Sequence, residues 1–261
     1  DGTMSKGYLG PPRLKARFAT DGTLFGMWVA CRDPYFNEIA AYSGADVLLV
    51  DAEHAPLTAE DIERIVIAAQ GSPASVIVRM TGIDQAAIKH VLDSGVEGIV
   101  VPFINTAADA KLLTRYAMYP PKGIRGIGPR RAQYLADGPW DYQRNANEEI
   151  VVLIPQIEHI DAVNNLDDIC AVEGIGGLFL GPSDLSLSLG HGGEYDHPEV
   201  VAAKRQILDA SRKHNLPLAV ASTGIDDARY WVGEGAKLVM VAGDASLISS
   251  GMTRILVQVR T

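Results

Sequence analysis

Eight short apolar runs, separated by longer amphipathic segments, constrain the fold of this chain more than any other feature. Each run is apolar throughout, which is typical of a parallel strand covered on both faces. Eight strand–helix units predict an α/β fold, a closed (β/α)₈ TIM barrel. An open doubly wound sheet is the alternative, but no dinucleotide-binding glycine pattern follows the first run. The runs are Leu24–Val29, Val47–Val50, Val76–Val78, Gly98–Val101, Val151–Ile154, Gly177–Leu180, Leu218–Ala221 and Leu238–Val241.

The segments between the runs carry the signals that begin and end helices. Thr58-Ala-Glu-Asp61 resembles a capping box that opens a helix over Ile62–Ala69. A second amphipathic helix is expected over Val200–Asn215, where Asn215 and then Pro217 end the pattern. Before alternate strands, a glycine is expected to take the left-handed conformation that ends the preceding helix: Gly44, Gly95, Gly174 and Gly235.

Length and composition favour a single domain over residues 1–261. With 47% hydrophobic and 21% charged residues, 261 residues can bury one large core without disulfides. No stretch rich in proline, glycine and serine divides the chain. The two cysteines, Cys31 and Cys170, are far apart and have no metal-binding spacing, which fits a reducing cytoplasm.

The charge balance argues against nucleic acid as a partner. The net charge is −9, and the one basic cluster, Arg125 with Arg130 and Arg131, is too small to reverse it. No apolar run approaches the roughly 20 residues that span a bilayer. The start of the sequence lacks the apolar stretch of a signal peptide. We therefore expect a cytoplasmic protein that binds neither nucleic acid nor a membrane.

Polar residues follow the apolar runs at four strand ends. The second run leads into Asp51-Ala-Glu53-His54 and the third ends at Arg79. The fifth leads into Gln156 and Glu158, and the sixth into Gly181-Pro182-Ser183-Asp184. In a barrel these carboxyl ends meet at one mouth, where the active sites of this fold lie.

Glu158 and Asp184 are candidate metal ligands. They follow adjacent strands, so their carboxylates are expected to approach one cation, with Gln156 and Ser183 beside them. Two carboxylates together with water suit Mg²⁺ or Mn²⁺, which prefer oxygen donors. The alternative is that each carboxylate only caps the helix that follows it.

Arg79 and His54 are candidate catalytic residues. The Arg79 guanidinium offers a fork that matches a carboxylate or an enolate oxygen, and the alternative is a structural ion pair with Asp51 or Glu53. The two roles can coexist. His54 is a candidate general base, because the nearby Asp51 carboxylate can fix the tautomer of its imidazole. Trp28 ends the first strand, where it walls the site or belongs to the core.

Two further patterns bear on the mechanism. A Schiff-base mechanism needs a buried lysine at a strand end, and no predicted strand ends on lysine, which favours metal catalysis. The irregular segment over residues 119–147, between the fourth and fifth strands, is expected on the active-site side of the barrel as a substrate lid or a subunit contact.

Five motifs in matching order and spacing resemble the HpcH/HpaI class II aldolases, a family that includes 4-hydroxy-2-oxoheptanedioate (2,4-dihydroxyhept-2-ene-1,7-dioate) aldolase. The resemblance runs from about Gly26 to the C-terminus. It is carried by Asp51-Ala-Glu-His-Ala-Pro56, Val78-Arg79, Tyr119-Pro-Pro-Lys-Gly-Ile-Arg-Gly126, Pro155-Gln-Ile-Glu158 and Gly181-Pro-Ser-Asp-Leu185.

The resemblance implies a barrel of the phosphoenolpyruvate/pyruvate type and a metal-dependent, reversible aldol reaction. A 4-hydroxy-2-oxo acid is cleaved to pyruvate and an aldehyde through a pyruvate enolate held at Mg²⁺, Mn²⁺ or Co²⁺. The residues matching Glu158 and Asp184 bind the metal, and the one matching Arg79 stabilises the enolate. His54 with Asp51 matches the proton-transfer pair.

The resemblance also implies a substrate site and an assembly. Positions matching Gln156, Gly181, Pro182 and Ser183 surround the pyruvate carboxylate and the metal waters. Ser183 stands where several relatives have alanine, a departure that is expected to leave the chemistry intact. Relatives form hexamers, as trimers of dimers, so a C-terminal helix over about residues 246–259 is expected to pack on a neighbouring subunit.

Two other functions fit the same residues. One is a related metal-enolate reaction, either acyl-CoA lyase chemistry or oxaloacetate decarboxylation, which would use the same metal and Arg79. The other is a barrel that binds a metabolite without catalysis. The sequence does not name the aldehyde, because no motif is assigned to that half of the substrate.

Overall fold

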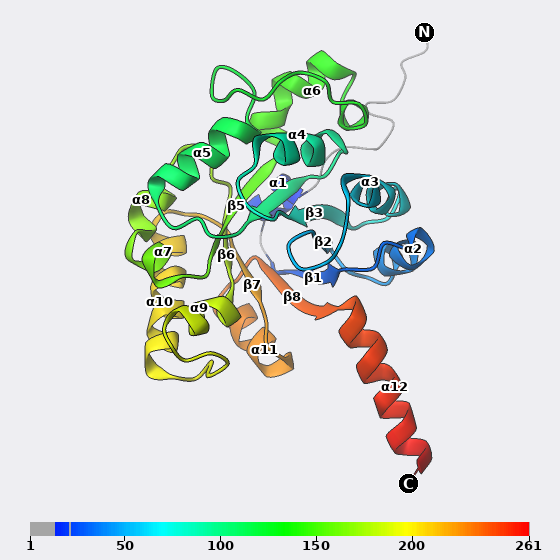
Figure 1. Ribbon diagram of the computed structural model, residues 1–261, viewed down its shortest axis with the longest axis vertical. Coiled ribbons are helices and arrows are strands. Elements are labelled where there is room, and N and C mark those ends of the chain that lie inside the picture. Colours follow the sequence, from blue (N-terminus) through cyan, green and yellow to red (C-terminus); the bar gives the residue numbers. More distant parts are fainter. Residues whose placement is uncertain (1–13, 21, 261) are drawn as a thin grey trace.

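The computed structural model describes residues 14–20 and 22–260, and its centre is a closed barrel of eight parallel strands (Figure 1). The strands pair in chain order, and β1 closes the barrel against β8. The predicted (β/α)₈ barrel is therefore confirmed. The strands are β1 Leu24–Val29, β2 Val47–Asp51, β3 Ser75–Arg79, β4 Gly98–Val101, β5 Val152–Ile157, β6 Leu178–Leu180, β7 Leu218–Ala221 and β8 Leu238–Gly243.

Helices surround the barrel and cover most of its outer face (Figure 1). Those between the strands are α2 Pro34–Tyr42, α3 Ala59–Ala68, α4 Gln85–Asp93, α5 Ala107–Ala117, α6 Pro139–Asn145, α7 Ile160–Asn164, α8 Leu166–Cys170, α9 Pro182–Ser188, α10 Pro198–Lys213 and α11 Ile225–Gly233. The predicted capping box of α3 is present, since Thr58 Oγ1 accepts from the Asp61 N–H and the Asp61 carboxylate accepts from the Thr58 N–H.

Both faces of most strands are buried, which explains why the runs are apolar throughout; the exceptions are Phe25 of β1 and Val241 of β8, which are 42% and 47% exposed. Alternate side chains such as Leu48 and Val50 pack outward against the helices, while Val47 and Leu49 belong to a second cluster inside the barrel. The four expected helix-ending glycines are all left-handed, with φ values of 100°, 91°, 98° and 81° in chain order.

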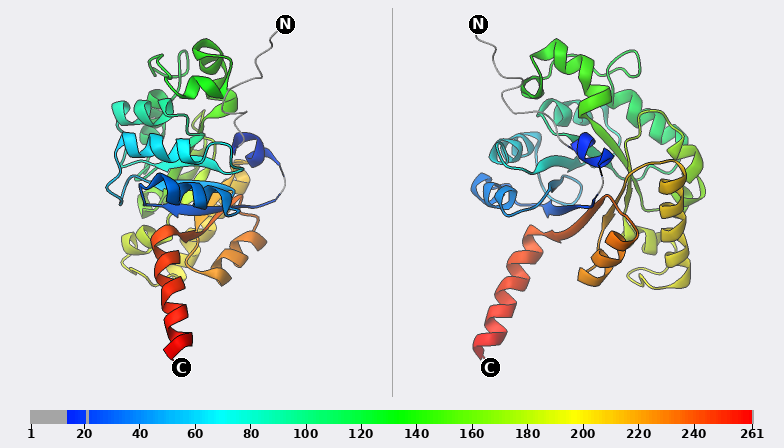
Figure 2. Two further views of the ribbon diagram at one scale, coloured as in Figure 1. Left: turned by 90° about the vertical axis from the view of Figure 1, so that its right-hand side faces the viewer. Right: turned by 180° about the vertical axis from the view of Figure 1, so that it is seen from behind.

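Helix α1, Leu14–Ala19, closes the amino end of the barrel (Figure 2). Its buried residues, Leu14 and Phe18, pack into the interior cluster. The Leu14 N–H donates to a carboxylate oxygen of Glu97 at 2.6 Å, just before β4 begins. Ligand access therefore has to come from the opposite, carboxyl end of the strands.

The long segment before β5 lies at the amino end of the barrel, so the expectation that it borders the active site is wrong. It follows α5 rather than β4, and connections from a helix to the next strand run along the end opposite the mouth. It contains a 3₁₀ turn at Ala132–Leu135, then α6, and a π turn at Ala146–Ile150. Arg131 anchors it by donating to the Ser94 carbonyl and to Gln70.

Helix α12, Asp244–Arg260, projects away from the barrel (Figures 1 and 2). Only its first residue, Asp244, is buried, and this carboxylate accepts the N–H groups of Ala30 and Cys31, each at 2.7 Å. Apolar side chains are exposed along the rest of the helix: Leu247, Ile248, Met252, Ile255, Val257 and Val259. Among the described helices, none has the length and apolar character needed to cross a membrane.

Candidate active site

The strand register brings Asp51 and Arg79 together at the mouth. They are paired positions at the ends of β2 and β3. Arg79 donates through Nε to Asp51 Oδ1 at 3.0 Å and through Nη2 to Asp51 Oδ2 at 2.7 Å. Burial opposes ionisation of Asp51, but the hydrogen bonds and charge of Arg79 hold its pKa below the usual value. The structural ion pair considered from the sequence is therefore present.

A second carboxylate and an indole ring complete the surroundings of Arg79. Its Nε lies 3.3 Å from Glu53 Oε2, and its guanidinium carbon lies 4.4 Å from the centroid of the Trp28 ring. The Arg79 side chain is only 10% exposed. Trp28 also packs edge-on against Phe179 inside the barrel, so it belongs to the core and borders the mouth at once. A guanidinium clamped in this way is preorganised to receive an anion.

Glu158 is the most deeply buried carboxylate at the mouth, with 2% of its surface exposed. It follows the end of β5, where Oε1 accepts the Phe103 N–H at 2.9 Å and Oε2 accepts a hydrogen bond from the Gln156 side chain. Burial raises the pKa of Glu158, and the negative charges of Glu53 and Asp184 raise it further. The ionised form therefore lacks a compensating cation.

Asp184, in the first turn of α9, lies near enough to affect both glutamates electrostatically. Its charge contributes to raising the pKa of Glu53 as well as that of Glu158, after the larger effect of burial on each. Three carboxylates from three different strand ends thus share one region of the mouth. The helix-capping alternative is not what the structure shows for Asp184, because the N-cap residue of α9 is Gly181 and no side chain caps this helix.

Gly181 permits this close approach. A Cβ atom at position 181 would lie 3.1 Å from Glu158 Oε2 and 3.2 Å from Gln156 Nε2. Its φ of −99° is accessible to any residue, so the requirement for glycine comes from space and not from backbone conformation. The Gly181 N–H donates to the Ile157 carbonyl at 3.2 Å and ties the turn to β5.

The donor set fits a divalent cation that prefers oxygen. Glu158, Asp184 and Glu53 supply carboxylates, and Gln156 Oε1 and Glu53 Oε2 are buried without a hydrogen-bond partner among the described residues. Burying an oxygen atom without a partner destabilises the fold unless water, an ion or a ligand binds to it. Mg²⁺ and Mn²⁺ bind carboxylates and retain water, which matches two or three carboxylates at an open mouth.

His54 lies beside Glu53, and its imidazole does not form the expected contact with Asp51. The Asp51 carboxylate accepts the backbone N–H groups of Glu53 and His54, at 3.1 and 3.2 Å, and is otherwise held by Arg79. The His54 side chain is 64% exposed, and its Nε2 lies 3.7 Å from Glu53 Oε2. The turn after β2 therefore presents the backbone of residue 54 to Asp51 and its ring to Glu53.

Ser183 and Pro182 shape the same turn. Pro182 is buried at the first position of α9, where a proline needs no N–H partner. The Ser183 hydroxyl lies 3.1 Å from the Tyr195 hydroxyl, which links the mouth to the loop before α10. Sequence reasoning missed Glu53 and Tyr195 as site residues. Glu53 carried a detectable signal, a third carboxylate at a strand end, whereas Tyr195 is 12 residues from Ser183 and carried none.

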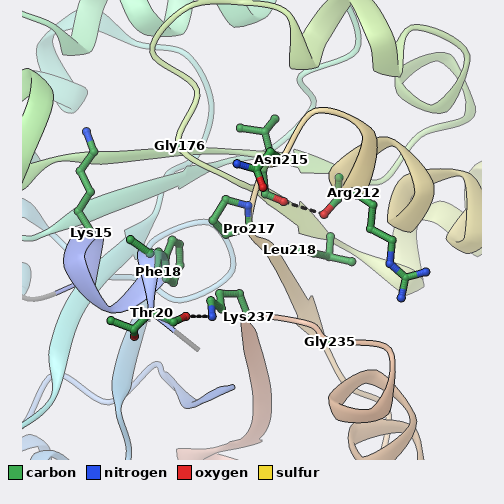
Figure 3. Close-up of a pocket in the computed structure, with 13 residues that line it drawn as sticks. Lys15, Phe18, Thr20, Gly176, Arg212, Asn215, Pro217, Leu218, Gly235 and Lys237 are labelled. Atoms are coloured by element: carbon green, nitrogen blue, oxygen red, sulfur yellow. Dashed lines mark hydrogen bonds between the residues drawn. The ribbon is translucent and has the colours of Figure 1, made fainter. Parts of the chain in front are cut away.

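A sizeable cavity lies away from the mouth. A cavity of about 560 Å³ opens at the amino end, beside α1 and the starts of β6, β7 and β8 (Figure 3). Its cations are engaged already: Lys237 donates to the carbonyls of Thr20 and Gly22, and Arg212 pairs with Glu234 at 3.0 Å. No carboxylate of the mouth contributes to it.

Comparison with known proteins gives a consistent result. The family described as HpcH/HpaI aldolase/citrate lyase matches residues 24–250. The chain is 35% identical to a hydroxypyruvate/pyruvate aldolase of Pseudomonas aeruginosa, over 93% of this chain and 91% of that protein. It is 34% identical to a 5-keto-4-deoxy-D-glucarate aldolase of Klebsiella pneumoniae, over 94% and 95%. An HpcH/HpaI aldolase/citrate lyase family structure from Burkholderia cenocepacia superposes with a TM-score of 0.88 at 31% identity, covering 95% and 99% of the two chains. The chain is a carbon–carbon lyase of the aldolase type, and it belongs to the HpcH/HpaI aldolase/citrate lyase family.

Proposed function

We propose that this enzyme catalyses the metal-dependent, reversible aldol cleavage of a 4-hydroxy-2-oxo acid to pyruvate and an aldehyde. The observation that carries the proposal is the buried Glu158 carboxylate, which faces Asp184 and Glu53 beside the clamped Arg79 guanidinium. A negatively charged pocket next to one fixed cation is suited to an anionic substrate only when a metal ion balances the carboxylates.

Glu158 and Asp184 would hold the metal, with Glu53 and Gln156 close enough to orient its water ligands. When bound, Mg²⁺, Mn²⁺ or Co²⁺ supplies a Lewis acid that withdraws negative charge from the oxygen atoms of the substrate. The oxygen donors of the mouth favour these ions over softer metals. Which of these three ions is bound in the cell would depend on their availability.

Arg79 would stabilise the enolate that forms when the C3–C4 bond breaks. Asp51 engages its Nε and Nη2, which fixes the plane of the guanidinium and would leave Nη1 to meet the substrate. Because the clamp is complete before the substrate arrives, little reorganisation is needed as charge develops on the enolate oxygen. Asp51 therefore acts as a positioning residue for Arg79.

His54 would remove the proton from the C4 hydroxyl and return it in the reverse reaction. Its exposed imidazole would reach a substrate in the mouth, with the Glu53 carboxylate 3.7 Å from its Nε2. The remaining substrate contacts are proposed from Trp28, Gln156, Gly181, Pro182 and Ser183, which border the same region.

A homo-oligomer of this chain, a hexamer built as a trimer of dimers, is also proposed. The support is the row of apolar side chains along α12, which the barrel of the same chain leaves exposed. A subunit neighbour that covers this row would remove apolar surface from water. We place the enzyme in the cytoplasm, in keeping with its free cysteines.

A coupled screen tests the proposed reaction. Pyruvate release would be followed from 4-hydroxy-2-oxo acids, and the reverse reaction from pyruvate with succinic semialdehyde, lactaldehyde, glycolaldehyde and tartronate semialdehyde. Cleavage of at least one such acid, lost on metal removal, supports the proposal. Oxaloacetate decarboxylation with no aldol cleavage would favour the related metal-enolate reaction. Oxalate binding without any turnover would favour a non-catalytic barrel.

A further inference from the structure

A cluster of two histidines and a glutamate lies on the loop between α9 and α10, outside the candidate active site. His191 and His197 belong to the loop, and Glu199 lies in the first turn of α10. The ligating atoms of the three residues lie within 4.8 Å of one another. Across residues 14–20 and 22–260, no other three histidine, cysteine or acidic side chains meet this condition.

The three side chains already have the spacing of ligands around one small cation. His191 Nε2 lies 3.0 Å from Glu199 Oε2, and the two imidazole rings stack with centroids 3.4 Å apart at 21°. In a tetrahedral zinc site, Zn–N and Zn–O distances of about 2.0–2.2 Å place two ligand atoms a little over 3 Å apart, close to the separation of His191 Nε2 and Glu199 Oε2. Imidazole nitrogen and carboxylate oxygen are both ligands that such a cation accepts.

His197 offers a lone pair without rearrangement. Its Nδ1 accepts the Glu199 N–H at 3.4 Å, a long hydrogen bond whose loss would cost little if a cation took its place. At His191, the cation would take the place of the proton shared with Glu199.

Backbone hydrogen bonds hold the loop in place independently of any cation. The His191 N–H donates to the Ser186 carbonyl at 2.8 Å, and two further turns run from Glu194 N–H to His191 and from His197 N–H to Glu194. Ser186 is fully buried, and its hydroxyl accepts the Gly193 N–H at 3.1 Å. The ligand positions are therefore preorganised, which lowers the entropic cost of binding.

Nearby carboxylates favour a cation at this site, although it lies at the amino end of α10. The amino end of α10 carries a partial positive charge that opposes a cation. Glu194 and Asp196 in the loop, together with Glu199, place three carboxylates within six residues and offset it.

We propose that His191, His197 and Glu199 bind a transition-metal ion of the Zn²⁺ or Ni²⁺ class. Two imidazoles and one carboxylate suit these ions, whereas the all-oxygen mouth suits Mg²⁺ or Mn²⁺. Water completes the coordination, because the cluster faces solvent on one side. The loop also carries Tyr195, whose hydroxyl meets Ser183 at 3.1 Å, so the ion would brace a loop that borders the mouth.

Zn²⁺ binding to the full-length protein tests the site. The titration uses a chromophoric chelator as competitor, with Mg²⁺ in millimolar excess and the Asp184→Asn substitution disabling the mouth. One equivalent of Zn²⁺ is expected to bind, and His191→Ala and Glu199→Gln should each weaken it at least tenfold. His214→Ala, which removes another carboxylate-paired histidine of the chain, should change nothing.

A spectroscopic measurement separates this cluster from adventitious surface binding. One equivalent of Cu²⁺ is expected to show hyperfine coupling to two imidazole nitrogens in the electron paramagnetic resonance spectrum, and the coupling should disappear in the His191→Ala/His197→Ala variant. Equal Zn²⁺ affinity in wild type and His191→Ala, or an unchanged Cu²⁺ spectrum in the double variant, would overturn the proposal.

Discussion

Arg79 shows how one residue can be structural and chemical at the same time. Asp51 and Glu53 compensate its charge and Trp28 packs beneath it, so the fold itself holds the guanidinium at the mouth. The contacts that would make it a structural ion pair are the same contacts that preorganise it for catalysis.

Arg79→Lys should separate these roles. A lysine keeps the positive charge but cannot form the two-point clamp with Asp51, so kcat should fall roughly a hundredfold to a thousandfold while metal affinity stays close to wild type. Arg64→Lys, at an exposed arginine paired with Glu60, is the matched control and should leave both kcat and metal affinity unchanged. Wild-type turnover in Arg79→Lys would return Arg79 to a purely structural role.

Glu158→Gln should stabilise the metal-free protein at neutral pH. Burial raises the pKa of Glu158 above the usual value of 4.5, so its ionised form disfavours folding. The carboxyl contribution is favourable below pH 4.5 and is lost as pH rises through the raised pKa. Thermal unfolding should therefore show a higher Tm for the variant at pH 8 and little difference near pH 4. Adding Mg²⁺ should raise the Tm of wild type only; a variant less stable than wild type without metal would contradict the assignment.

The sequence predicted which residues lie at the mouth better than it predicted their contacts. Charged residues at strand ends placed Asp51, Arg79, Glu158 and Asp184 at one mouth, because parallel strands end at one edge. It could not predict that His54 would turn toward Glu53, since that depends on the backbone of a three-residue turn. The Tyr195–Ser183 contact joins a loop to a turn and has no periodic signal.

At the scale of the elements, the turn from β6 into α9 sets how closely two strand ends approach. Gly181→Ala should push this turn away from Glu158, because the new Cβ would lie 3.1 Å from its carboxylate. Metal affinity and kcat should both fall by about tenfold or more, because misplacing these ligands by a fraction of an ångström costs at least about 1.4 kcal/mol of interaction energy, which corresponds to a factor of ten.

Gly224→Ala is the matched control. Gly224 occupies the same position before α11, its backbone is extended, and a Cβ there would meet nothing within 4 Å. Comparing metal titrations of the two variants isolates the effect of space at position 181. Equal affinities would show that the approach of β6 to β5 does not control the site.

Element positions followed from the sequence wherever local physics decides them. The left-handed conformations of Gly44 and Gly95 follow from how a helix must end before a strand. The segment over residues 119–147 lies at the other end of the barrel from the one that its lack of periodicity suggests. Its turns and α6 depend on tertiary contacts such as Arg125 with Asp93 at 2.7 Å.

At the scale of the whole molecule, α12 is the element that its own barrel leaves uncovered. Ile248, Met252, Ile255 and Val259 fall on one helical stripe at spacings of four, three and four residues. Ile255→Asp should therefore weaken self-association, because it places a charge in an apolar contact. Sedimentation velocity should show smaller species than wild type.

Thr253→Asp adds the same charge to α12 outside this stripe and should leave the assembly intact. If both variants sediment like wild type, the stripe is not the subunit contact. If wild type itself is a monomer, the proposed hexamer is wrong.

The central claim is that the carboxylates and Arg79 stabilise a pyruvate enolate with the help of a metal ion and not through a lysine adduct. Exchange of the pyruvate methyl protons in D₂O, followed by NMR, measures enolate formation without requiring the aldehyde. The account predicts exchange with Mg²⁺ or Mn²⁺, its loss with EDTA, its return on adding metal back, and no covalent adduct after borohydride treatment. Full exchange in metal-free protein, or borohydride trapping of pyruvate on a lysine, would contradict it.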